Sequence, residues 1–184
     1  MSAQTNYGFA TGQGVPGGIY DMYHYPVDSR FNEEANGKLL LGTGVVTGTI
    51  PGSNVARPTA ESKAADFEGV VVNGFTQQHD LEGNISVMNN QTIGVMRRGR
   101  IWARLADKAE PKYGDALHLI VDGDDAGCFA TTGGVEVPGR FIGAASNGVA
   151  PIELYGNIAG SAAVAAASVD EGKAVSGSTD KTGE

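Results

Sequence analysis

The amino-acid sequence predicts an all-β fold: a small glycine-rich β-barrel or sandwich with an extended N-terminal arm and a low-complexity C-terminal tail. Three observations favour this class. The apolar residues fall in short runs, turn-forming residues separate nearly every pair of runs, and no amphipathic helix is evident between them. The 28 glycines and 7 prolines in 184 residues also limit the length of any regular element.

Composition divides the chain into three segments. Residues 1–36 mix glycines with scattered aromatic residues and show neither alternation nor a helical stripe, so we expect an extended arm. Such an arm needs a surface to lie on, either its own domain or a neighbouring subunit. Residues 37–155 carry the β-type runs and form the core domain. Residues 156–184 are rich in Ala, Gly and Ser, lack aromatic residues, and are expected to form a tail.

The core contains nine β-type runs, which are bounded by Gly, Pro, Asn or Asp. The expected strands are residues 38–41, 44–50, 69–75, 92–96, 100–105, 117–121, 128–131, 140–144 and 152–155. One short helix is expected over residues 59–67, because Pro58 and Thr59 can start a helix and Gly69 can end it.

Bulk charge excludes some functions. A formal net charge of -8 and a pI near 4.8 argue against nucleic acid as a partner, because phosphate binding needs an excess of Lys and Arg. The sequence shows no signal-peptide pattern and no run that could span a bilayer, so we expect no membrane partner and synthesis in the cytoplasm. The single cysteine, Cys128, cannot form an internal disulfide and is expected to be a buried thiol.

A basic stretch with one tryptophan is the strongest candidate for a protein interface. With a period of two, one strand face carries Arg98, Arg100, Trp102 and Arg104, and the other carries Arg97, Ile101, Ala103 and Leu105. A β-bulge at Gly99 would place Arg97 on the first face instead of Arg98. Arginine and tryptophan dominate interface energetics, so we predict contact with a partner protein.

Two alternatives to this interface stay open: arginines that pair with nearby carboxylates on a solvated face, and direct nucleic-acid contact. Three tyrosines of the arm, Tyr20, Tyr23 and Tyr25, are further predicted interface residues.

Catalytic and metal-binding patterns are weak. The run from Asp122 to Gly127 superficially resembles a calcium loop, but it lacks the terminal bidentate Glu, and Asp-Gly between two expected strands favours a hairpin turn. His24, His79 and His118 are far apart, and no signature supports a nucleophilic pairing of Cys128 with a histidine. We therefore expect no enzymatic activity, no metal and no cofactor.

Residues 86–154 resemble the structural cement proteins of tailed bacteriophages. The resemblance rests on a pattern of the form V-M-R-R-G-R-x-W, a Gly-Asp before a short apolar strand, a Gly-containing turn into an aromatic residue, and a closing apolar strand. The corresponding residues here are Val95 to Arg100 with Trp102, Tyr113 to Asp115 before residues 117–121, Gly127 to Phe129, Arg140 to Gly143, and Pro151 to Tyr155.

The resemblance implies a virion structural protein without catalysis. Such a protein binds the major capsid protein on the outer surface of the assembled head, typically as a trimer at local three-fold positions, and holds neighbouring capsomers against the pressure of the DNA. A tail, baseplate or fibre-associated β-protein is the first alternative. A metal-dependent small hydrolase or binding module that uses residues 122–125 with His118 is a remote one.

Overall fold

The computed structural model describes residues 14–21, 25–35, 37–74, 78–79 and 85–156. The strands are β1 (Val27–Asn32), β2 (Gly44–Thr47), β3 (Asn54–Ala56), β4 (Phe67–Val71), β5 (Gln78–His79), β6 (Ile85–Ser86), β7 (Thr92–Met96), β8 (Gly99–Arg104), β9 (Ala116–Leu119), β10 (Phe129–Ala130), β11 (Val135–Phe141) and β12 (Val149–Leu154). One 3-10 turn, η1 (Ala64–Asp66), is the helical element of the described residues. The predicted all-β class is confirmed.

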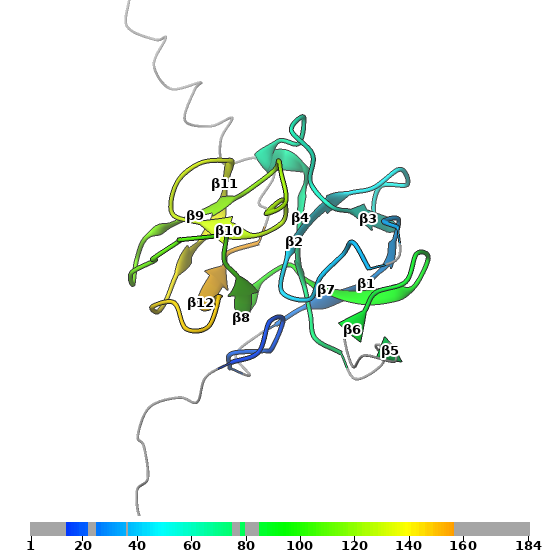
Figure 1. Ribbon diagram of the computed structural model, residues 1–184. Coiled ribbons are helices and arrows are strands. Elements are labelled where there is room, and N and C mark those ends of the chain that lie inside the picture. The colour runs from blue at the N-terminus through cyan, green and yellow to red at the C-terminus, as the bar shows by residue number, and fades with distance from the viewer. Residues whose placement is uncertain (1–13, 22–24, 36, 75–77, 80–84, 157–184) are drawn as a thin grey trace, which may run out of the picture.

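Two strand assemblies lie side by side (Figure 1). Strands β1, β3, β2, β4 and β7 close into a barrel, and strands β10, β9, β11, β12 and β8 form a five-stranded sheet. Strands β5 and β6 pair separately. Among the described strands, β1 pairs with β3 in parallel and the other strand pairs are antiparallel; an isolated parallel bridge also joins Leu105 to Phe129. The chain crosses from the barrel to the sheet between the end of β7 at Met96 and the start of β8 at Gly99.

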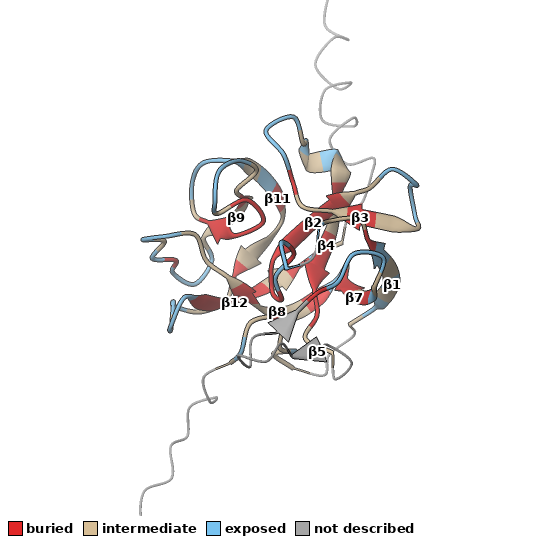
Figure 2. Cartoon of the chain, turned by 45° about the vertical axis from the view of Figure 1, so that its right-hand side comes forward, coloured by how far each residue is buried: buried red, intermediate tan, exposed pale blue. Residues whose placement is uncertain are grey.

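Two apolar cores explain why some barrel strands are buried on both faces (Figure 2). Val71 and Val95 belong to the core inside the barrel. Their chain neighbours Val70 and Met96 belong to a larger core that the barrel shares with the five-stranded sheet. Because successive side chains of a strand point to opposite faces, β4 and β7 supply both cores at once. Each therefore contains adjacent apolar residues instead of an apolar–polar alternation.

Two glycines permit this packing. A Cβ at Gly44 on β2 would lie 2.5 Å from Leu119 and 3.0 Å from Phe129, so glycine lets the sheet approach the barrel closely. Gly69 has a φ of +148° and lies beside the register shift between β2 and β4. A Cβ there would collide with the carbonyl oxygen of Met96.

Three local predictions were wrong. Residues 38–41 form turns and coil instead of a strand, although Leu39 and Leu41 are buried in the barrel core. Over residues 59–67 only η1 forms, since Phe67 already begins β4. Residues 27–32, assigned to the arm, form barrel strand β1. Their sequence lacks an apolar alternation because polar side chains occupy the face that looks toward the barrel core.

The ends of the chain bear on the predicted arm and tail. Residues 14–21 lie on the chain's own five-stranded sheet, and residues 1–13 and 157–184 fall outside the described part. Apart from residues 27–32, the division of the chain into arm, core and tail stays a prediction. Within the described residues, no helix has the length and apolar character that crossing a bilayer requires.

Candidate protein interface

A row of charged side chains crosses the outer face of the five-stranded sheet. In the strand register, Glu153 of β12 lies directly opposite both Arg140 of β11 and Arg100 of β8. Neighbours on these strands, Ile152 and Ile101, point into the shared core, so the charged residues point outward. Asp21 extends the row beyond β8. The order across the face is Asp21, Arg100, Glu153, Arg140.

Short contacts join the members of this row. The Nη1 of Arg100 donates to Asp21 at 2.8 Å, and its Nε donates to Glu153 at 3.0 Å. Arg140 donates from Nε to the other carboxylate oxygen of Glu153 at 2.9 Å, with Nη2 2.7 Å from the same oxygen. Both arginines are partly exposed, at 35% and 37% of their side-chain surface. Each guanidinium is thereby held in one orientation while staying accessible.

The electrostatics of the row follow from these contacts. Burial raises the pKa of Glu153, but hydrogen bonds from Arg140 and Arg100 outweigh that effect and leave its pKa below the ordinary value of 4.5. The carboxylates of Asp21 and Glu153 raise the pKa of Arg100, and Glu153 and Tyr155 raise that of Arg140. All of these shifts favour the charged forms.

Aromatic side chains stand at both ends of the row. The guanidinium carbon of Arg140 lies 5.6 Å from the centre of the Tyr113 ring, a cation–π geometry, and Tyr113 is 70% exposed. At the other end, the rings of Tyr20 and Trp102 are 5.6 Å apart with an interplanar angle of 51°.

Residues 14–21, which we call the strap, cover the edge of β8. Three backbone hydrogen bonds join them. The N–H of Gly17 donates to the carbonyl oxygen of Trp102 at 2.7 Å, the N–H of Trp102 donates to the carbonyl oxygen of Gly18 at 2.8 Å, and the N–H of Tyr20 donates to that of Arg100 at 3.0 Å. Gly14 lies so close to the indole of Trp102 that a Cβ would overlap the ring. The strap therefore acts as a sixth strand, and it closes an edge that could otherwise pair with another chain.

The predicted arginine face is confirmed in part. Arg100, Trp102 and Arg104 share the outward face of β8, with Ile101 and Ala103 buried behind them. Arg104 donates from Nε to the carbonyl oxygen of Leu41 at 2.9 Å, which ties the sheet to a barrel loop.

The period of two does not extend before Gly99. Residues 97 and 98 form the link between two strands, so neither predicted register applies there. Arg97 turns to the barrel, and Arg98 is exposed without an ion pair or hydrogen bond to the described residues.

The three predicted tyrosines differ in their surroundings. The Tyr20 ring lies beside that of Trp102 in a tilted arrangement, Tyr25 packs against the shared core, and Tyr23 lies outside the described residues. The residues that sequence reasoning missed are Asp21, Glu153, Arg140 and Tyr113. Glu153 had a usable signal, because it is the one charged residue in an otherwise apolar strand, β12.

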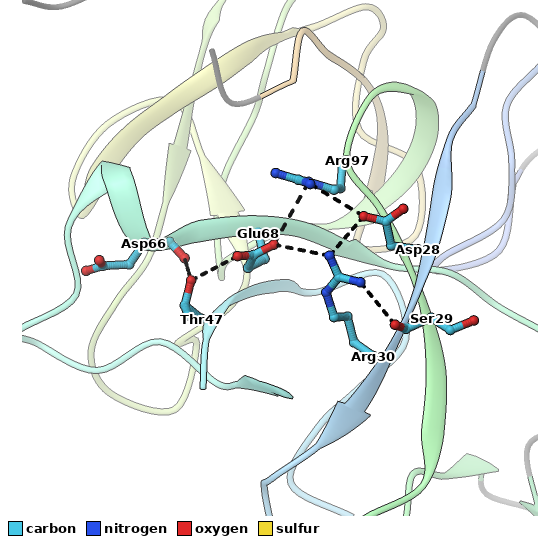
Figure 3. A network of polar contacts seen from close by, with 7 residues as sticks. All are labelled: Asp28, Ser29, Arg30, Thr47, Asp66, Glu68 and Arg97. Atoms are coloured by element: carbon cyan, nitrogen blue, oxygen red, sulfur yellow. Dashed lines mark hydrogen bonds and ion pairs between the residues drawn. The ribbon is translucent and has the colours of Figure 1, made fainter. Parts of the chain in front are cut away.

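A second charged cluster lies at one end of the barrel (Figure 3). Asp28 and Arg30 of β1 lie opposite Val95 and Ile93, so their side chains share the face that points to the barrel core. Arg30 is 2.9 Å from Asp28 and 3.9 Å from Glu68 of β4, and Arg97 reaches the same two carboxylates at 3.5 and 3.9 Å. Thr47 donates to Glu68 at 3.0 Å. Among the described residues, the Nε of Arg30 is buried without a hydrogen-bond partner.

The loop that superficially resembles a calcium site binds a guanidinium group instead. Arg57 donates to the carbonyl oxygens of Gly123, Asp124 and Ala126. The Asp125 carboxylate accepts from the backbone N–H of Asp107 at 3.0 Å. In the described part of the chain, no three His, Cys, Asp or Glu residues are grouped as a metal site would require.

The remaining candidates for reactive chemistry, Cys128 and His118, have different surroundings. Cys128 is buried, and burial, with a smaller contribution from Asp125, raises the pKa of its thiol. The Nδ1 of His118 lies 3.0 Å from the carbonyl oxygen of Gly133. A shallow hollow of about 260 Å³ beside Arg57 is lined in part by Glu34, Lys38 and Asp122.

Comparisons with known proteins agree with this geometry. Residues 3–155 match the model of a family described as structural cement protein (E217 gp24/Pam3 gp6). Among solved structures, a chain of "The capsid of Myoviridae Phage XM1" has a TM-score of 0.60 at 16% identity, over 84% of this chain and 98% of that chain. At this identity the likeness concerns the fold alone. No curated protein matches the chain.

Proposed function

This chain belongs to the structural cement protein family and is a phage virion protein that stabilises the capsid, and we propose from that premise how it does so. It binds the outer surface of the assembled head through the major capsid protein and holds neighbouring capsomers together. It is made in the host cytoplasm and carries out no catalysis. The observation that carries the proposal is the family match, which extends over the whole described core.

The geometry supports attachment through faces instead of strand edges. The barrel closes on itself, and the strap covers the edge of β8. A protein built in this way can be present at high concentration without pairing edge to edge. Contact with a shell then rests on side chains, and many modest contacts repeated over a lattice add up to firm attachment.

The proposed contact residues, toward the shell or toward other copies of this chain, are the predicted set: Arg98, Arg100, Trp102, Arg104, Tyr20, Tyr23 and Tyr25. Arg98 is the sharpest test among them, because it is exposed and has no ion pair within the described chain. As the resemblance implies, the expected assembly on the head is a trimer at local three-fold positions.

The experiment is cryo-electron microscopy of heads that lack this protein, mixed with the purified full chain. Density on the outer shell at local three-fold positions supports the proposal. Bare heads contradict it, and labelling of tails or baseplates would favour the tail-component alternative.

Binding of variants to the same heads tests the residues. Arg98→Glu is expected to weaken binding by about tenfold or more without a loss of folding, since charge reversal at an interface costs several kcal/mol. Trp102→Ala is expected to weaken assembly on the heads more than it weakens folding. The matched control is Lys38→Glu, which makes the same charge change on an exposed loop beside Arg57. Equal losses for Arg98→Glu and the control would remove Arg98 from the interface.

A further inference from the structure

The row across the outer face of the sheet alternates in charge. From one end to the other it reads Asp21 (negative), Arg100 (positive), Glu153 (negative) and Arg140 (positive). Each residue belongs to a neighbouring strand or to the strap, and strands are about 4.8 Å apart, so the row is about 15 Å long. Its net charge is zero, whereas the whole chain carries -8.

Reversing this row gives its electrostatic complement. Consider a two-fold axis that lies in the plane of contact, runs perpendicular to the row and passes between Arg100 and Glu153. A second copy generated by this axis presents its row in the inverted order. Asp21 of each copy then faces Arg140 of the other, and Arg100 faces Glu153. All four positions meet an opposite charge, as a self-complementary two-fold contact requires.

We propose that the outer face of the five-stranded sheet binds a second copy of this chain about such a two-fold axis. The ends of the row fit the same arrangement. The axis brings the exposed ring of Tyr113 toward Tyr20 and Trp102 of the second copy, where aromatic rings can pack against each other.

Pre-organisation favours this contact. The guanidinium groups of Arg100 and Arg140 are already oriented by Glu153, so their side chains lose little conformational freedom on binding. A neutral row also suits two acidic molecules, because it is a surface on which they approach without a local excess of like charge. The contact needs no shell, and its two-fold operator differs from the heterologous contacts of a trimer.

The test is charge-swap complementation between two full-length variants, followed by sedimentation velocity. In a dimer of the Asp21→Lys variant, the new positive charge at position 21 of each copy faces Arg140 of the other copy, so two positions repel. In Arg140→Glu, the same two positions become negative against negative. When the variants are mixed, each of the four positions again meets an opposite charge.

Four results are expected. The wild type forms a dimer, or an even-numbered assembly built from two-fold contacts, at about 100 µM or below. Each variant alone associates at least about tenfold more weakly. An equimolar mixture recovers the wild-type association, although both variants still carry their altered row. Lys38→Glu, as the control for net charge, associates like the wild type.

Several results would overturn the proposal. These are a wild type that stays monomeric, a trimer that the variants leave unchanged, or a mixture that fails to recover association. Circular dichroism and thermal unfolding verify that the variants fold. If either reversal prevents folding, Asp21→Asn and Arg140→Gln replace them, and each is expected to weaken association by a smaller factor. Because no heads are present, failure here is distinguishable from failure of the capsid-binding proposal.

Discussion

Two clusters in this molecule contain the same groups, two arginines and two carboxylates, but differ in placement. In the sheet row (Asp21, Arg100, Glu153 and Arg140) the contacts are 2.7 to 3.0 Å, and the arginine side chains are more than one-third exposed. In the barrel-end cluster (Asp28, Arg30, Glu68 and Arg97) three of the four ion-pair distances are 3.5 Å or more, while Arg30 and Glu68 are only 14% and 16% exposed.

Burial and contact length assign different roles to the two clusters. A buried charge that loses its partner is left uncompensated, so the barrel-end cluster should matter for folding. Exposed pairs contribute little to stability, yet they fix side chains that a partner can meet, so the sheet row should matter for assembly. Four predictions test this distinction, in order of decreasing expected effect.

Arg30→Ala should destabilise the protein most. It leaves Glu68 and Asp28 at the barrel end without their better-buried partner, and we expect the free energy of unfolding to fall by about 2 kcal/mol in urea titrations. Arg140→Ala, which removes an arginine from the sheet row, should change that free energy less. An equal fall in the free energy of unfolding for the two variants would contradict the different roles of the two clusters.

Gly14→Ala should loosen the strap. The added Cβ overlaps the indole of Trp102, and overpacking of this kind costs about 1 kcal/mol. Limited proteolysis should then cut the strap faster, and self-association should weaken because Asp21 moves. Val15→Ala, at a 55% exposed position of the same strap, is the matched control and should leave both unchanged.

Acid should weaken the sheet row through Glu153. Folding lowers the pKa of this group below 4.5, so its contribution to stability is fully present above the ordinary glutamate value and is lost as the pH falls through the lowered value. In Glu153→Gln the acid limb of the stability–pH curve should be shallower. Glu136→Gln, an exposed change on β11, serves as the control; an identical curve for both variants would contradict the role of Glu153.

Salt should separate the clusters by the smallest margin. At 1 M salt the screening length is about 3 Å, so interactions between exposed charges are weakened most. In double-mutant cycles, the coupling between Arg100 and Glu153 should fall toward zero between low and high salt, whereas the coupling between Arg30 and Glu68 should persist. The opposite order would mean that the barrel end is open to solvent.

Local patterns account for what was predictable. Turn residues and short apolar runs predicted the all-β class, and the alternation in β8 placed Arg100, Trp102 and Arg104 on one face. These signals work because they depend on neighbours within a few residues. Strand β1 is not predictable from such patterns. Its inward-facing residues Asp28 and Arg30 are charged, so its sequence has no apolar period.

Local sequence patterns do not predict the ion-pair partners of the arginines. Arg100 meets Glu153 at a separation of 53 residues and Asp21 at 79, while Arg97 meets Asp28 at 69. Which strands become neighbours, and in what register, is set by the packing of two apolar cores. The same packing ends the alternation at Met96, where the chain leaves the barrel.

The sequence by itself therefore determined the strand-rich class and the outward arginine face, because backbone geometry converts a period of two directly into two faces. Only the tertiary structure decided that Asp21, Arg100, Glu153 and Arg140 form one alternating row. It also decided that Arg57 occupies the acidic loop and that β4 and β7 serve two cores. The physical reason is that these features depend on strand order and register, which long-range burial of apolar surface selects and no local pattern encodes.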